Sequence, residues 1–338
     1  MTLDEYASTL LPININDDDI KINQFGLVTG DMDDYFAVLV EGNKVRLMPG
    51  PEFGPRLYRG QNCFYDNCKA SIFRNKEYAK YILNKIKLFE FIKLISSNPI
   101  VKKMQNFRIM EHNLSIDFEG LAQHYELYTD MLDFTRSRDI AMFFALCRKN
   151  DVTNQYEPIL DETAEAVVYT LDINKMINNK EGLNIIGFQP LVRPYKQKAF
   201  SIRQNINDNL NLKDYISYEN IRINKAQSKK YCEMFEGGAR LFPKDIVDEK
   251  AYILKTSKEI DNKVVEHMFR RNMFPDNIKN EIDLIRLLKN DKINIFDKIT
   301  ELSFTPNEIS VIEKSWLEIE KDFMPKIKRR LCADHYQS

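Results

Sequence analysis

The sequence has no excess of charge of either sign. It contains 49 Lys and Arg residues against 50 Asp and Glu residues, so its formal net charge is −1. This balance does not indicate a whole-chain attraction to nucleic acid or to an anionic membrane, although it leaves room for local basic patches. The 338 residues, 43% of them hydrophobic, can bury one large core, or form one large domain and a smaller one.

Cysteine is scarce, and its spacing is not that of a metal site. None of the five cysteines belongs to a Cys-x-x-Cys motif or a Cys/His array, and the closest pair, Cys63 and Cys68, has no matching second pair. A structural zinc ion usually needs four such ligands. The sequence therefore predicts no metal site and free, reduced cysteines.

Long apolar runs and familiar catalytic motifs are also missing. No stretch approaches the roughly eighteen apolar residues of a membrane-spanning helix, and the N-terminal residues do not resemble a secretory signal. The prediction is a soluble, cytoplasmic protein. A nucleotide-binding glycine loop, a G-x-S-x-G elbow, a zinc-protease motif and a kinase signature are absent too, which excludes those enzyme classes as far as motifs can.

Hydrophobic periodicity predicts an α+β fold, with a mixed-sheet body followed by a helical C-terminal part. We expect a polar lead-in over residues 1–49, with a strand at 44–47, then the main domain over 50–255 and the helical region over 256–338. Within the main domain, residues 56–61 are predicted to form a short strand that ends in a tight glycine turn. Other expected elements are helices at 77–96 (stopped by Pro99), at 118–125 and after Thr135 or Ser137, and strands at 166–172 and 199–202.

Apolar stripes of helical spacing dominate the sequence beyond Asn224. They occur in residues 224–236, 258–272, 278–289 and 307–323, and from about residue 258 we expect almost only helix. In the last of these segments, Ile312, Trp316, Ile319 and Phe323 are predicted to pack inward.

Three polar residues stand out because they lie inside otherwise apolar segments. Arg59 in the strand 56–61 can present a planar donor to a phosphate or carboxylate, or it can simply pack its stem while its head meets solvent. His124 is one of only four histidines, and a lone histidine is more often structural than catalytic. Asp133 can cap backbone N–H groups at the start of the following helix, or it can receive Arg59 or His124.

A fourth segment, residues 193–201, combines a proline-stiffened approach with a small residue at the start of a strand. Pro194 precedes Gln197 by three residues, and Ala199 opens the strand. The small residue would allow a ligand to approach closely. An ordinary loop leading into a strand has the same pattern.

Taken in order, these segments resemble the FRG domain, a family named for its Phe/Tyr-Arg-Gly motif. That motif reads Tyr58-Arg59-Gly60 here, and residues 123–135 resemble the family's Gln-His-Tyr-Gly-Leu-Pro-Thr-Arg-Leu-Leu-Asp-Trp-Thr stretch. The family's Ala-x-x-Phe-Ala helix, Gln-x-Ala-Phe segment and Leu-Phe-Pro-Asp-like element correspond to residues 141–145, 197–200 and 241–244. Within the stretch 123–135, Glu126, Tyr128 and Asp130 replace the usual Gly, Pro and Arg, so we expect the turn there and one positive charge to be affected.

The same motifs are similar, more distantly, to arginine-type ADP-ribosyltransferases. This resemblance implies NAD as a substrate, no metal, and a protein or nucleic-acid target inside the cell. It implies that Arg59 and Gly60 bind the phosphate side of NAD and that Thr135 and Ser137 shape the nicotinamide pocket. The catalytic glutamate of those enzymes is replaced by Gln197.

Two functions follow as expectations from the resemblance. The first is an NAD-dependent ADP-ribosyltransferase or NAD glycohydrolase of a bacterial defence or toxin-like system, with Asp133, His124 and Gln197 as its catalytic residues. The alternative is a non-catalytic FRG module that uses the same cluster to bind a phosphorylated ligand or a partner protein. In either case we expect Arg59, His124 and Asp133 to converge in one concave site.

Overall fold

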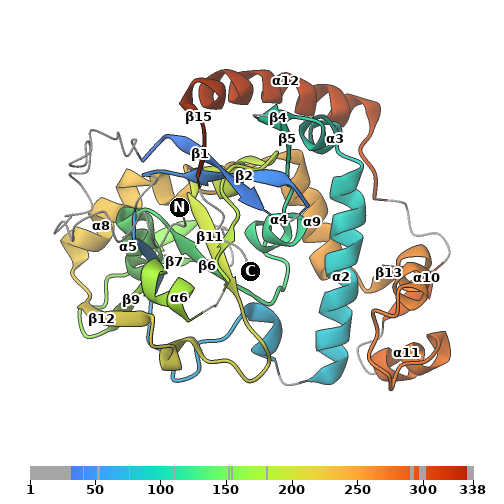
Figure 1. Cartoon of the computed structure of the whole chain (residues 1–338). Helices are drawn as coiled ribbons and strands as arrows, with labels where there is room; N and C mark the ends of the chain where they lie inside the picture. The colour runs from blue at the N-terminus through green and yellow to red at the C-terminus, as the bar shows by residue number, and fades with distance from the viewer. Residues whose placement is uncertain are drawn as a thin grey trace.

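The structure is a computed structural model that describes residues 32–40, 42–51, 54–75, 77–109, 111–150, 153, 155–179, 182–289, 293–296 and 302–332. Helices and mixed sheets alternate along this part of the chain, so the predicted α+β class is confirmed (Figure 1). Most of the predicted polar lead-in, residues 1–31, lies outside the described residues.

The larger sheet has six strands in the order β10-β11-β6-β3-β9-β12. Along each strand, side chains alternate between two faces. Leu57 and Tyr169 on one face join a core cluster with Phe200, whereas Tyr58 and Val168 on the other face pack against helix α5 (Arg138–Leu146). The strands are β3 (Arg56–Gln61), β6 (Met131–Thr135), β9 (Glu165–Asp172), β10 (Asn184–Ile185), β11 (Ala199–Arg203) and β12 (Ile216–Arg222).

The two central strands of this sheet, β3 and β6, are joined by a single residue pair. β3 pairs with β9 along its whole length, from Arg56 to Gln61, but with β6 only where Tyr58 lies opposite Thr135. The sheet therefore opens between β3 and β6 next to Arg59. This opening positions the candidate site described below.

Gly60 lies within β3 and not in the tight turn that the sequence analysis predicted. A Cβ atom built on Gly60 would lie 1.8 Å from the backbone oxygen of Ala141 in α5. Since real atoms do not approach so closely, only glycine allows β3 to lie against this helix. The predicted glycine turn is therefore wrong: Gly60 is required because β3 packs closely against α5.

The second sheet has the strand order β15-β1-β2-β5-β4. Two of its strands lie in the predicted lead-in: β2 contains the strand predicted at residues 44–47, whereas β1 was not predicted. β15 from the C-terminal region pairs parallel with β1. Helix α12 (Pro306–Phe323) lies across this sheet (Figure 1). As predicted, Trp316 packs inward, with 2% of its surface exposed, and Phe323 joins it. The strands are β1 (Tyr35–Val40), β2 (Lys44–Pro49), β4 (Arg108–Ile109), β5 (His112–Leu114) and β15 (Ile327–Cys332).

Helices α2 (Tyr78–Ser96) and α4 (Phe118–His124) form the side of the molecule next to the sheets. As predicted, α2 ends before Pro99. Pro99 itself stands in the first turn of the next helix, α3 (Pro99–Gln105), which the Asn98 side chain caps. Short elements complete the body: η1 (Ser71–Phe73), β7 (Cys147–Lys149), β8 (Tyr156–Pro158), α6 (Ile173–Asn178), α7 (Val192–Lys196), η2 (Leu210–Leu212) and η3 (Glu236–Gly238).

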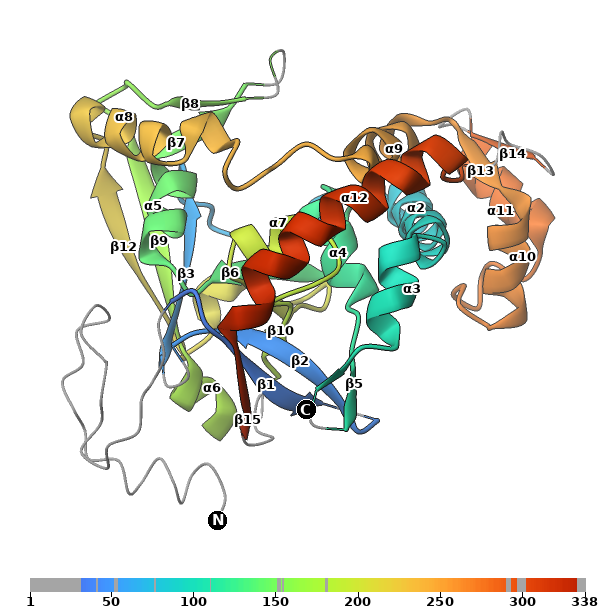
Figure 2. The ribbon, with the colours of Figure 1, turned by 90° about the horizontal axis from the view of Figure 1, so that it is seen from above.

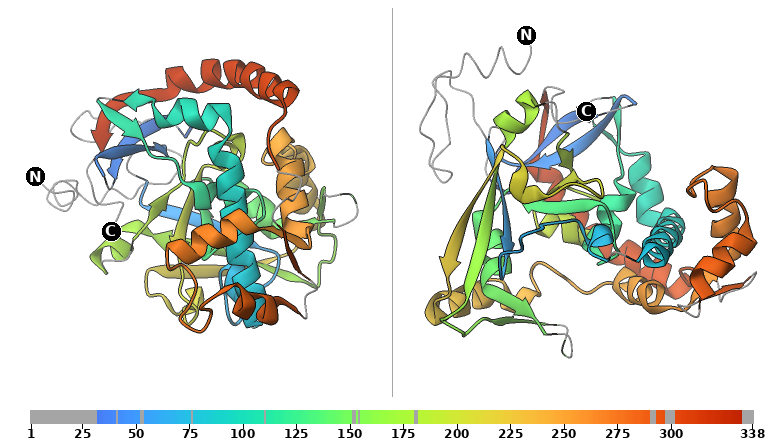
Figure 3. Two further views of the ribbon diagram at one scale, coloured as in Figure 1. Left: turned by 90° about the vertical axis from the view of Figure 1, so that its right-hand side faces the viewer. Right: turned by 90° about the horizontal axis from the view of Figure 1, so that it is seen from below.

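We expected the C-terminal region to be almost wholly helical, and this prediction is wrong because the region also contains strands. Strands β13 (Glu259–Asp261) and β14 (Asn294–Phe296) form a small parallel pair beside α10 and α11, which pack against α2 (Figures 2 and 3). The backbone N–H of Asp261 donates to buried Glu90 of α2 at 2.7 Å. The helices here are α8 (Lys225–Met234), α9 (Ile246–Thr256), α10 (Asn262–Arg270) and α11 (Glu281–Leu288), and η5 (Met324–Lys326) follows α12.

The domain boundaries at residues 49 and 255 stay predictions, and core clusters include residues from both sides of each boundary. Phe91 of α2 belongs to one cluster with Leu254 and Phe304, and Tyr35 belongs to another with Phe188 and Trp316. Among the described helices, none has the length and hydrophobicity that crossing a membrane requires.

The contact between β3 and α5 leads to a first prediction. Gly60→Ala should lower the free energy of unfolding by about 3 kcal/mol or more, because the new Cβ atom has to push the strand and the helix apart. Urea titration measures this loss. Gly42→Ala is the matched control, since Gly42 has open space around it and a positive φ of 71°, so alanine should cost only about 1 kcal/mol there. Equal losses in both variants would contradict the close-packing role.

Candidate functional site

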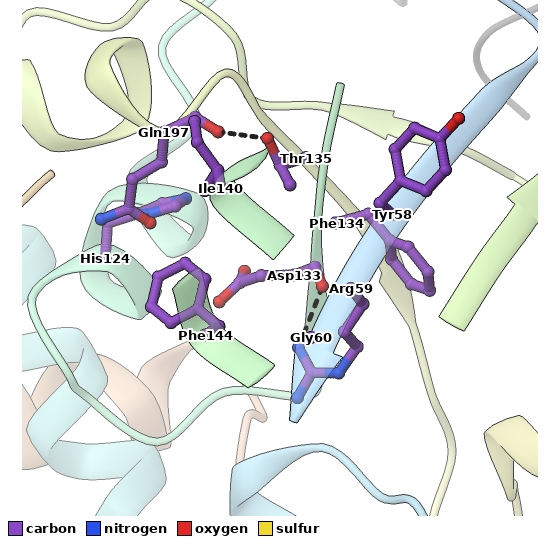
Figure 4. Close-up of a pocket in the computed structure, with 10 residues that line it drawn as sticks. All are labelled: Tyr58, Arg59, Gly60, His124, Asp133, Phe134, Thr135, Ile140, Phe144 and Gln197. Carbon is purple, nitrogen blue, oxygen red and sulfur yellow. Dashed lines mark hydrogen bonds between the residues drawn. The ribbon is translucent and has the colours of Figure 1, made fainter. Parts of the chain in front are cut away.

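A pocket of about 210 Å³ opens where β3 and β6 separate. It brings together Arg59, His124 and Asp133, which lie on three different elements (Figure 4). In the close-up, Asp133 stands between Arg59 on one side and the pair His124 and Gln197 on the other. The lining residues are Tyr58, Arg59, Gly60, His124, Asp133, Phe134, Thr135, Ile140, Phe144 and Gln197.

Arg59 spans the opening between the two strands. Its Nη1 atom donates to the backbone oxygen of Asp133 at 2.9 Å, so the guanidinium connects β3 to β6 beyond their single residue pair. Its Nε atom is buried and has no hydrogen-bond partner among the described residues. The side chain is therefore held at one nitrogen and has donors left for a ligand.

Asp133 lies in the middle of β6 and does not cap the following helix, which was one of two interpretations from the sequence. The hydroxyl of Ser137 caps α5 instead, by accepting from the N–H of Ile140. The carboxylate oxygen Oδ2 of Asp133 accepts from Nε2 of Gln123 at 2.9 Å. Its other oxygen, Oδ1, is buried without a partner in the described part of the chain.

The amide of Gln123 is itself oriented by a buried hydroxyl. Thr129 donates its hydroxyl hydrogen to Oε1 of Gln123 and accepts the backbone N–H of Met131 at 3.2 Å. Because Oε1 faces Thr129, the NH₂ group of Gln123 faces Asp133. Neither Gln123 nor Thr129 has a role that the sequence predicts, although both lie in the stretch 123–135 that carries the family resemblance.

His124 is held in one tautomer by a chain of two hydrogen bonds. Nε2 of Gln197 donates to the backbone oxygen of Leu241 at 3.1 Å, so Oε1 of Gln197 faces Nδ1 of His124 at 3.0 Å. Nδ1 must therefore carry the hydrogen, which leaves Nε2 of the neutral ring as an acceptor. That Nε2 atom is buried, has no partner among the described residues, and belongs to a side chain that lines the pocket.

Burial lowers the pKa of His124 below its usual value, and the positive charge of Arg193 lowers it further, against the opposing effects of Asp133 and Gln197. Arg193 is buried and donates to the backbone oxygen of His124 at 3.3 Å, while its other terminal nitrogen pairs with Asp248 at 2.6 Å. The imidazole is thus neutral near pH 7 and fixed in position from two sides.

Gln197 lies just before strand β11, as the predicted strand at residues 199–202 implies. It caps the short helix α7, and Lys198 then takes a left-handed φ of 49° before β11 begins. The Gln197 amide is bound by His124 at its oxygen and by the backbone of Leu241 at its nitrogen, so its role in this structure is to orient His124. A sequence alone does not reveal this, because Leu241 is 44 residues away.

Thr135 and Ser137 differ from the expectation that both shape the pocket. Thr135 lines it, but its hydroxyl donates to the backbone oxygen of Gln197 at 2.7 Å and accepts the N–H of Ser137 at 3.1 Å. Ser137 is not among the lining residues and acts as the cap of α5. The hydroxyls that the sequence suggested for ligand binding therefore serve the backbone.

An aromatic wall completes the pocket. Half-buried Phe144 lines it and packs edge-on against Phe242 and Tyr156, whose rings stack at 5.3 Å. The site thus combines a cation, a neutral imidazole and a carboxylate with a flat apolar surface. Over the residues that the structure describes, no group of three or more His, Cys, Asp or Glu side chains is placed to hold a metal ion.

Burial of His124 predicts how stability depends on pH. An unfolded histidine takes up a proton below about pH 6.5. The folded state resists this protonation, so it loses stability as the pH falls through that value. His124→Asn, whose amide can still donate to Gln197, should reduce the stability difference between pH 7.5 and pH 5.5 by roughly 1 kcal/mol. Urea titrations at both pH values measure it, with the exposed His267→Asn as control. An unchanged difference in His124→Asn would contradict the assignment.

Comparison with known proteins bears on residues 55–154, which match the family model of the FRG domain. The match includes Arg59, His124 and Asp133 but not Gln197 or Leu241, so it is shorter than the resemblance over residues 50–255 that the motifs indicate. No curated protein and no solved structure matches the chain. The similarity to ADP-ribosyltransferases therefore stays a hypothesis. What the comparison does establish is that this chain contains an FRG domain.

Proposed function

We propose that the pocket binds the ribosyl end of a phosphorylated nucleotide, with NAD as the first candidate, and cleaves its N-glycosidic bond. The observation that carries this proposal is a set of three buried polar atoms without protein partners among the described residues. They are a guanidinium donor on Arg59, an imidazole acceptor on His124 and a carboxylate oxygen on Asp133, all on residues that line one pocket. A phosphorylated sugar offers a complementary group to each of them.

Each residue then has a distinct role. Arg59 binds a phosphate oxygen through its free donors. Nε2 of His124 accepts a hydrogen bond from a ribose hydroxyl, and Oδ1 of Asp133 faces the anomeric carbon. Phe144 provides a flat surface for the nicotinamide ring. Gln123 and Gln197 act as positioning residues that hold Asp133 and His124.

The proposed reaction is a substitution at the anomeric carbon. The bond between this carbon and the nicotinamide nitrogen breaks, and its electron pair leaves with neutral nicotinamide. The ribosyl group becomes cationic, and the negative charge of Asp133 stabilises it. A hydroxyl of water, of a protein or of a nucleic acid then bonds to the carbon, and its proton passes to Asp133 or His124.

The size of the pocket limits which part of the nucleotide it holds. A volume of about 210 Å³ is below the roughly 300–1,000 Å³ of pockets for drug-sized ligands. The pocket therefore takes one end of a dinucleotide and leaves the rest outside, next to Arg59.

A second candidate, the non-catalytic module that binds a phosphorylated ligand, is favoured by one observation. Gln197, which corresponds to the catalytic glutamate of the transferases in the resemblance, is uncharged and has both ends of its amide bound to protein. If Asp133 does not supply the missing charge, the same pocket binds without turnover.

Asp133→Asn separates these two functions. Asparagine can still accept from Gln123 but has no negative charge, so we expect nicotinamide release from NAD to fall by roughly 100-fold or more while binding is kept. Nicotinamide release and a melting curve are measured together, because a folded variant is needed for the comparison. Turnover at the wild-type rate in a folded variant would refute this role of Asp133. NAD binding without turnover in the wild type would support the binding module instead.

Arg59 should contribute through the shape of its guanidinium as well as its charge. We expect Arg59→Ala to weaken NAD binding by roughly 10- to 100-fold, because a hydrogen bond to a charged group is worth about 1.5–3 kcal/mol. Arg59→Lys should be intermediate, since lysine lacks the planar pair of donors. Calorimetric titration gives the affinities, and Arg56→Ala, an exposed arginine on the same strand, is the control. If Arg59→Lys bound NAD as tightly as the wild type, Arg59 would contribute only its positive charge and not the planar shape of its guanidinium.

A further inference from the structure

Three exposed aromatic residues gather on the sheet beyond the pocket. Phe64, Tyr65 and Tyr218 have 39%, 49% and 48% of their surface exposed, and the rings of Phe64 and Tyr218 lie 5.1 Å apart. Large aromatic side chains are usually buried, so a cluster of exposed ones indicates a binding surface.

Tyr218, one member of this cluster, is in register with Arg59. Arg59 on β3 pairs with Tyr169 on β9, and Tyr169 pairs with Tyr218 on β12. Directly paired residues place their side chains on the same face of a sheet, and neighbouring strands are about 4.8 Å apart. The backbone of Tyr218 is therefore about 10 Å from that of Arg59. The buried ring of Tyr169 lies between them and contacts Tyr218 with a centroid distance of 5.8 Å.

The loop that carries Phe64 and Tyr65 is firmly attached. Asn211 donates to the backbone oxygen of Tyr65 at 2.8 Å, and Asn209 donates to that of Asp66 at 2.9 Å while accepting the N–H of Cys68 at 3.0 Å. The exposed rings therefore stand on a backbone that is already ordered. Little conformational entropy is lost when a ligand stacks on them.

Arg74 provides a second positive charge, close enough to interact electrostatically with both Arg59 and Tyr65. Arg74 follows η1, and neither Arg59 nor Arg74 forms an ion pair with any described residue. Burial lowers the pKa of Arg74, and the nearby charge of Arg59 is the second cause. Two guanidinium groups that repel each other in this way suit a ligand with two phosphates.

We propose that Phe64 and Tyr218 form a base-binding subsite for the far end of the same ligand. The ligand is then a dinucleotide whose ribosyl end fills the pocket on the α5 side of the sheet. Its diphosphate passes Arg59 in the opening between β3 and β6 and reaches Arg74, and its second base stacks on the exposed rings on the opposite face. Every nucleobase has a flat π face that can stack on such rings. The subsite rests on the proposed function and narrows its substrate from nucleotides in general to dinucleotides.

The test compares NAD with nicotinamide mononucleotide, which lacks the second base. In calorimetric titrations, Tyr218→Ala and Phe64→Ala should each weaken NAD binding by roughly five- to 100-fold and leave mononucleotide binding within about twofold. Tyr218→Phe keeps the ring and should bind NAD like the wild type. Tyr252→Ala is the matched control, because Tyr252 is an aromatic on α9 with 68% of its surface exposed, far from β12 (Figure 2).

The outcomes distinguish the subsite from the pocket. If the wild type binds both ligands and Tyr218→Ala binds NAD with unchanged affinity, the subsite is wrong and the pocket stands. Equal losses for NAD and the mononucleotide would also refute the subsite, because they would indicate damage to the pocket itself. A wild-type protein that binds neither ligand would overturn the proposed function, and the subsite with it.

Discussion

Strand β3 lies against helix α5 so closely that Gly60 has no room for a Cβ atom, and the arrangement of the site follows from this contact. The helix starts directly after β6, so the same segment that ends one strand covers the other. With β3 held against α5, β3 and β6 keep only one residue pair. The opening that results exposes polar backbone within a sheet, and the guanidinium of Arg59 compensates by bonding to the Asp133 carbonyl.

Asp133, His124 and Arg59 share one pattern: a protein group binds one polar atom of the side chain, and another polar atom has no partner among the described residues. Gln123 holds one oxygen of Asp133, Gln197 holds one nitrogen of His124, and the Asp133 carbonyl holds one nitrogen of Arg59. An unsatisfied buried polar group costs about 1–3 kcal/mol, so three of them together are expensive for a fold of ordinary stability. Such a cost is typical of sites that gain their missing partners from a ligand.

The sequence predicted the strongly periodic elements well and the sheet edges poorly. The stripe that includes Trp316 identified α12, and the polar residues in apolar segments identified the pocket. It missed β15, whose letters IKRRLC are too basic to suggest a strand, because pairing with β1 overrides the local preference. The sequence suggested a catalytic role for Gln197 and none for Gln123, whereas the orienting hydrogen bonds of both depend on partners that only the fold brings close.

An ion pair of Arg193 and a hydrogen bond of Tyr125 connect the site to the segment that begins α9. Arg193 bonds to the backbone of His124 and to Asp248, and the hydroxyl of Tyr125, the residue after His124, donates to Asp245. Both acids belong to the start of α9 or precede it directly. The backbone of His124 and the neighbouring Tyr125 side chain are therefore both tied to the start of α9. The position of His124 in the FRG domain of this chain thus depends on contacts with residues outside the matched range 55–154.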